Sequence, residues 1–78
     1  MLEIISSTKG DAGRTFETAE DFCAWLEEMQ PSGFSVNADG VELSDVDFDG
    51  GEDKDGCWDA KRCRRALDRK STRLNSSH

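Results

Sequence analysis

Apolar and polar residues alternate at the start of the chain. Leu2 and Ile4 flank Glu3, which is the two-residue period of a short strand. Residues 10–13 form a Gly- and Asp-containing turn cluster, and the triplet at 14–16 follows it. The pattern predicts a first hairpin in which residues 14–16 return beside the N-terminal strand.

The next apolar residues follow a helical period. They recur at i, i+3, i+4 and i+7, at Phe22, Trp25, Leu26 and Met29. Thr18 is suited to cap the N-terminus of such a helix, and residues 31–33, Pro-Ser-Gly, end it. The pattern predicts a helix over residues 19–30, with Phe22 and Trp25 as its core anchors.

Alternation returns after the helix and predicts a second hairpin over residues 34–43. The turn at residues 37–40 suits a type I turn with Gly40 in the left-handed region. Beyond residue 43 the apolar phase flips, because Val46 and Phe48 occupy even positions. Residues 44–45 are therefore expected to hold a bulge, a bend or the start of a fifth strand.

Residues 49–56 contain no apolar side chain and predict a loop. Residues 57–67 again have helical spacing, and Asp55 or Asp59 is placed to cap that helix. The expected fold is a small two-layer α+β domain, with a hairpin, a helix and a second hairpin (ββαββ) before a truncated C-terminal helix. Residues 1–67 are expected to form this single domain.

The segment at residues 68–78, DRKSTRLNSSH, differs in character from the rest of the chain. One reverse translation of it resembles, codon for codon, a widely used short-read sequencing adapter. We interpret it as a translated artefact of the kind found in metagenomic or draft sequence, expected to be disordered and unpacked. His78, the only histidine, belongs to this segment.

Charge divides the chain into two unequal parts. The formal net charge is −7, and residues 1–56 alone hold 15 acidic residues against 3 basic ones. A basic cluster at residues 61–65, KRCRR, follows. It suits a solvated helix face that pairs with the acidic loop, or a contact with phosphates in a nucleic-acid-binding fragment. The acidic remainder makes nucleic acid an unfavourable partner.

The side chains that most enzymes rely on are scarce. Without residues 68–78 the chain has no histidine and no tyrosine, which excludes histidine-based triads and histidine metal ligation. The cysteines at 23, 57 and 63 do not have the spacing of a zinc site. Cys23 and Cys63 are expected to be buried, and Cys57 is the candidate redox thiol at a helix N-terminus. We expect no catalysis and no cofactor.

One motif has named ligands. Residues 45–50, DVDFDG, match the opening of a calcium-binding loop, with Asp45, Asp47, Asp49 and Asp53 as candidate metal ligands. The resemblance to an EF-hand stops there, because Gly56 replaces the twelfth-position glutamate. An extended strand that turns its carboxylates to solvent explains the same alternation, and we expect no tight site.

These observations favour a small acidic cytoplasmic protein that binds or regulates another protein through an acidic or apolar surface. A calcium-binding module and a nucleic-acid-binding fragment are the alternatives. The N-terminus lacks the basic region and apolar run of a secretory signal. No apolar run approaches the roughly 20 residues that span a bilayer, so no membrane partner is expected.

Overall fold

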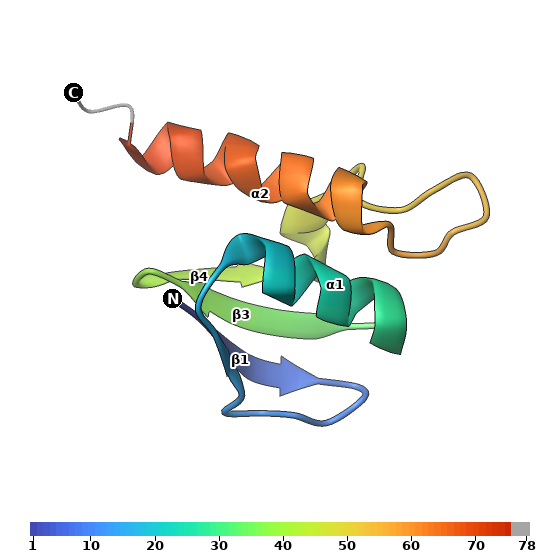
Figure 1. Cartoon of the computed structure of the whole chain (residues 1–78), viewed down its shortest axis with the longest axis horizontal. Coiled ribbons are helices and arrows are strands. Elements are labelled where there is room, and N and C mark those ends of the chain that lie inside the picture. The colour runs from blue at the N-terminus through green and yellow to red at the C-terminus, as the bar shows by residue number, and fades with distance from the viewer. Residues whose placement is uncertain (76–78) are drawn as a thin grey trace.

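A four-stranded antiparallel sheet forms one side of the molecule, and two helices lie over one of its faces (Figure 1). The computed structural model describes residues 1–75. The strand order is β2-β1-β3-β4. The elements in chain order are β1 (Leu2–Ser7), β2 (Thr15–Phe16), α1 (Ala19–Met29), β3 (Phe34–Ala38), β4 (Val41–Ser44), the 3-10 helix η1 (Asp45–Phe48) and α2 (Ala60–Asn75). The predicted α+β class and ββαββ order are confirmed.

Helix α1 has the boundaries that its capping residues predict. The Thr18 hydroxyl accepts a hydrogen bond from the Asp21 N–H at 3.2 Å, and acidic side chains occupy the first turn. At the other end Gln30 adopts a left-handed conformation with φ 49°, and its N–H donates to the Leu26 carbonyl at 2.9 Å. The chain thereby turns sharply into Pro31.

The core is a cluster of aromatic rings between α1 and the sheet. Phe22 is fully buried at its centre, with ring centroids 5.6 Å from Phe16, 6.0 Å from Trp25 and 5.9 Å from Phe34. Phe48 joins the cluster from η1, 6.0 Å from Phe22. Spacings of this size are those of favourable edge-to-face and offset contacts. The predicted role of Phe22 and Trp25 as core anchors is confirmed.

The second hairpin turns more tightly than the sequence suggested. Ala38 pairs with Val41, so only Asp39 and Gly40 form the loop. Both have positive φ, 53° and 91°, as a type I′ turn requires. The predicted type I turn is therefore wrong. A two-residue turn of this hand matches the right-handed twist of the flanking strands, which a type I turn does not.

The phase flip after β4 is a bend and not a fifth strand. Residues 45–48 form η1, in which Asp47 accepts hydrogen bonds from the Ser44 N–H at 2.9 Å and the Ser44 hydroxyl at 3.4 Å. This capping box turns the chain inward and buries Phe48. In a continuing strand, the backbone N–H groups would donate to a neighbouring strand. Here the Asp47 carboxylate accepts from the Ser44 N–H instead.

Helix α2 begins later and ends later than predicted. It starts at Ala60 and not at Cys57, because the Asp59 carboxylate caps it by accepting from the Arg62 N–H at 3.0 Å. It continues to Asn75, whereas we expected disorder from Asp68. Residues 68–75 contain neither Pro nor Gly to stop it. The adapter interpretation stays a prediction, and residues 76–78, His78 included, lie outside the described residues.

Candidate functional site

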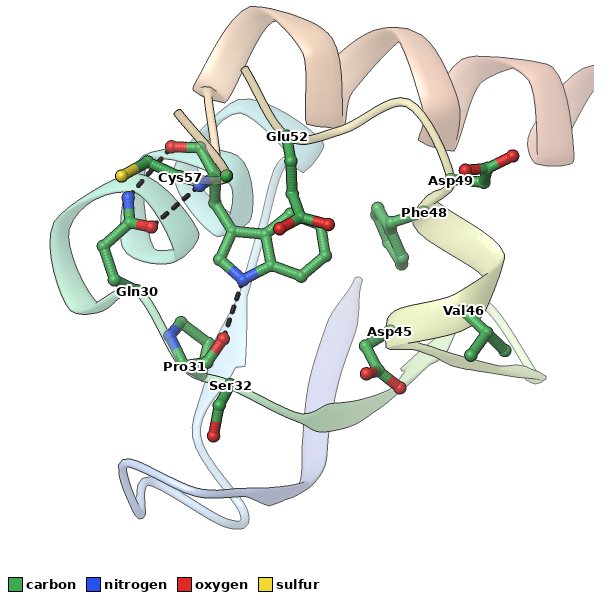
Figure 2. Close-up of a pocket in the computed structure, with 11 residues that line it drawn as sticks. Gln30, Pro31, Ser32, Asp45, Val46, Phe48, Asp49, Glu52 and Cys57 are labelled. Atoms are coloured by element: carbon green, nitrogen blue, oxygen red, sulfur yellow. Dashed lines mark hydrogen bonds between the residues drawn. The ribbon is translucent and has the colours of Figure 1, made fainter. Parts of the chain in front are cut away.

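A groove of about 740 Å³ opens between the C-terminal end of α1 and the segment that contains η1 and the loop after it. That volume lies within the range of about 300–1,000 Å³ typical of ligand pockets. Figure 2 shows Gln30, Pro31 and Ser32 on one side and η1 on the other. The lining residues are Gln30, Pro31, Ser32, Asp45, Val46, Phe48, Asp49, Glu52, Gly56, Cys57 and Trp58.

Trp58 forms part of the wall and is held by hydrogen bonds at both its backbone and its ring. The Gln30 amide oxygen accepts from the Trp58 N–H at 2.7 Å, and the Gln30 amide nitrogen donates to the Trp58 carbonyl at 2.9 Å. The indole N–H donates to the Pro31 carbonyl at 2.7 Å (Figure 2). Trp58 is only 8% exposed, so water competes little for these hydrogen bonds and they hold the side chain in place.

No sequence pattern predicts a role for Gln30 or Trp58 in a site. Trp58 is the second of two tryptophans and lies beside a polar loop, which is a weak signal that it packs against something. Gln30 gave no signal, because two of its three side-chain hydrogen bonds reach a residue 28 positions away. Only the fold brings the end of α1 beside the start of α2.

Gly51 sets the path of the loop behind the groove. A methyl group at this position would lie 2.9 Å from the Phe48 carbonyl oxygen, 3.1 Å from the Cys63 sulfur and 3.2 Å from the Trp58 ring. The Gly51 carbonyl also accepts a 3.4 Å hydrogen bond from the Cys63 thiol. The backbone can approach these groups so closely only because the residue has no side chain.

The described residues that line the groove carry negative charge and no positive charge, although the Arg69 guanidinium reaches the Asp49 backbone carbonyl at its rim. Asp45, Asp49 and Glu52 are its ionisable carboxylates, and its lining contains no Lys or Arg. Figure 2 shows the Asp45 and Glu52 carboxylates directed toward the space between the two sides, with Asp49 farther out beside η1. Val46 is 75% exposed at the same edge. A ligand in this groove would meet apolar walls and an acidic rim.

The four candidate metal ligands have separate surroundings. Asp47 caps η1, and the Asp53 carboxylate accepts from the backbone N–H groups of Asp55 at 2.9 Å and Cys57 at 3.0 Å. Asp45 and Asp49 line the groove. Within residues 1–75 no group of three or more His, Cys, Asp or Glu side chains is arranged to hold a metal ion.

The three cysteines divide as the sequence suggested in burial, but not in position. Cys23 and Cys63 are buried, and burial raises the pKa of each thiol to about 12. Both therefore stay neutral and unreactive at physiological pH. Cys57 is exposed, but it lies in the loop before α2 and not at a helix N-terminus. Cys57 therefore lies outside the first turn of α2, where the helix dipole would favour the thiolate that a redox role needs.

The predicted basic cluster lies on α2. Arg64 bridges to the Glu20 carboxylate of α1 at 3.2 Å and to Asp68 at 3.0 Å. Lys61, Arg62 and Arg65 are exposed. Among the described residues no ion pair joins this cluster to the acidic loop, so the expected pairing is not seen. Farther along the helix, Arg69 donates to the Asp49 backbone carbonyl at 3.0 Å.

The fold defines a class, a small α+β domain with one antiparallel sheet, but no family. No protein-family model matches this chain, and comparisons with the curated proteins and with the solved structures find no similar protein. Among the described residues, no helix combines the length and apolar character needed to cross a membrane.

Proposed function

We propose that this chain is a non-catalytic cytoplasmic binding protein, and that its groove holds a positively charged segment of another protein. The observation that supports this is the groove itself, which combines carboxylates at its rim with Phe48 and Trp58 in its walls. Long basic side chains suit both features, since their stems pack on apolar surface while their heads pair with carboxylates.

The charge of the whole molecule favours the same partner. With a net charge of −7 and most of its basic residues on one helix, the chain attracts a cationic segment and repels nucleic acid. Complementary charge of this kind raises the rate and specificity of association more than its strength. We therefore expect binding that weakens as the salt concentration rises.

A calcium-binding module is the less favoured alternative. Asp47 and Asp53 both accept backbone hydrogen bonds, and a calcium site would need their oxygens turned to a common centre. Calorimetry with calcium at physiological salt is expected to give millimolar binding or none. A micromolar isotherm abolished by Asp47→Asn would favour the calcium module instead.

The test is a titration with a short arginine-rich peptide, followed by the NMR shifts of backbone amides and the two indole N–H groups. We expect the largest shifts at Val46, Glu52, Cys57 and Trp58, and an oligoglutamate peptide of equal length is expected to cause none. Glu52→Lys and Asp45→Lys should each weaken binding about tenfold, the effect of losing roughly 1.4 kcal/mol.

The matched control is Glu3→Lys, which makes the same change in net charge on β1. Glu3 is exposed and alternates with the buried Leu2 and Ile4, so it lies on the sheet face away from the helices. This variant should bind almost as the wild type does. Shifts spread evenly over the acidic surface, or equal weakening by all three variants, would contradict the proposal.

A further inference from the structure

A stripe of positive charge runs along the outward face of α2. Lys61, Arg62 and Arg65 are exposed, and none of them makes an ion pair with any side chain that the structure describes. On a helix these three positions fall within one third of the circumference, opposite the side that buries Cys63 and Leu67. We call these three residues the α2 stripe.

Other arginines of the same helix already bind the acidic body of the molecule. Arg64 pairs with the Glu20 carboxylate at 3.2 Å, and the Arg69 guanidinium donates to the Asp49 carbonyl at 3.0 Å. Asp49 belongs to the rim of the groove. The Arg69 contact is made to the Asp49 backbone carbonyl, whereas the Arg64–Glu20 pair joins an α2 guanidinium to a carboxylate. The second kind of contact is the one that the α2 stripe offers to the carboxylates of the rim.

Among the described residues, the side chains of the α2 stripe make no ion pair with the groove of their own chain. The helix packs against α1 and η1 through the side that carries Cys63 and Leu67, opposite the stripe. One turn beyond Arg65, Arg69 reaches the rim, and it does so at the Asp49 backbone carbonyl. One copy thus exposes an acidic groove and a basic stripe whose charged side chains are not paired with each other within that copy. We propose that the occupant of the groove is the α2 stripe of a second copy of this chain, an inference that rests on the function proposed above.

The resulting contact is head-to-tail. Different surfaces of the two copies meet, so each added copy leaves a free groove at one end and a free stripe at the other. The three stripe residues all precede Asp68, so the contact does not depend on the origin of residues 68–78. Such an assembly grows with concentration and has no fixed size unless its geometry closes into a ring.

The salt dependence of self-association separates the attraction between stripe and groove from the repulsion between two acidic molecules. Two copies of net charge −7 repel one another at long range, and this repulsion is screened beyond about 8 Å at 0.15 M salt. The short ion pairs between stripe and groove persist at that salt and weaken toward about 1 M, where the screening length is about 3 Å. Self-association is therefore expected to be weak, strongest at intermediate salt and lost at high salt.

The experiment is sedimentation of the full chain over a concentration series that reaches millimolar, at low, intermediate and high salt. The average mass of the wild type is expected to rise with concentration at intermediate salt. Glu52→Lys in the groove and Arg65→Glu in the α2 stripe should each remain monomeric, while Glu3→Lys should associate as the wild type does. Circular dichroism checks that each variant is folded.

Mixing the two monomeric variants provides the decisive measurement. Arg65→Glu retains an intact groove and Glu52→Lys an intact stripe, so an equal mixture should form a one-to-one complex that grows no further. A wild type that is monomeric at every salt, or a mixture that stays monomeric while the wild type associates, would overturn the inference. A monomeric chain that still binds the arginine-rich peptide in its groove overturns only this inference and leaves the proposed function standing.

Discussion

Residues 1–44 and residues 45–59 keep their shape by different means. The first region places an apolar side chain on the buried face at nearly every position that its strand and helix periods assign, and a continuous aromatic cluster results. The second region has few apolar residues, and Phe48 and Trp58 are its two large buried side chains. Its conformation depends on single contacts such as those of Gln30, Gly51 and Asp47.

The contrast between residues 1–44 and residues 45–59 indicates where a binding site is expected in this domain. In the first region many apolar contacts hold each element in place, so its backbone forms a rigid scaffold. A segment held by a few polar contacts presents its remaining side chains to solvent, and the groove lies there. Substitutions of buried apolar residues in the first region should destabilise the whole chain, and loss of the single contacts that hold the second region should act mainly on the groove.

The largest effect is expected from Trp25→Ala. The substitution removes a side chain that is 3% exposed and the hydrogen bond that its indole donates to Asp11 at 2.9 Å. We expect a loss of about 3–5 kcal/mol in the free energy of unfolding, which is most of the stability of a domain this size. Urea denaturation followed by circular dichroism measures it, and a variant that remains well folded would show that the core is misplaced.

Gly51→Ala should come next. The added methyl would lie 2.9 Å from the Phe48 carbonyl oxygen, which is backbone and cannot rotate away. The expected loss is about 2 kcal/mol, typical of overpacking. Gly33→Ala is the matched control, since its nearest neighbour would be the Thr8 methyl at an ordinary 3.8 Å. Equal effects of the two substitutions would contradict the role assigned to Gly51.

Gln30→Ala is expected to act mainly on the second region. It removes both hydrogen bonds to the Trp58 backbone and costs about 1–2 kcal/mol, since the Trp58 N–H loses its partner. Local opening of residues 51–59 should expose the Cys63 thiol, which lies beneath Gly51. Native-state alkylation read by mass spectrometry should therefore speed up at Cys63 but not at Cys23. Equal acceleration at both sites would indicate global unfolding instead.

Deleting residues 68–78 should have the smallest effect. The described contacts of this segment are the exposed Arg64–Asp68 ion pair and the bond from Arg69 to the Asp49 carbonyl. Exposed ion pairs contribute little to stability, so thermal unfolding of the shortened chain should nearly match that of the full chain. A loss well above about 1 kcal/mol would show that the segment belongs to the folded domain.

The sequence alone predicts those helices and strands that depend only on residues close together in the chain. Apolar periods of two and 3.6 residues located β1, α1 and the second hairpin, and Thr18 and Pro31 marked the ends of α1, because strand, helix and cap depend on residues within a few positions of each other. The same patterns predicted the buried cysteines and the core role of Phe22 and Trp25.

The path of residues 45–59, and therefore the shape of the groove, depends on contacts between residues that are distant in the sequence. The Asp alternation in residues 45–49 favoured a strand over a calcium loop, but the bend that forms depends on a capping side chain and on burial of Phe48. Gln30 and Trp58 are 28 residues apart, and no local pattern predicts a hydrogen bond between them. Sequence periodicity reports which face of an element is apolar, whereas a groove is built where elements meet, and that depends on how they pack in space.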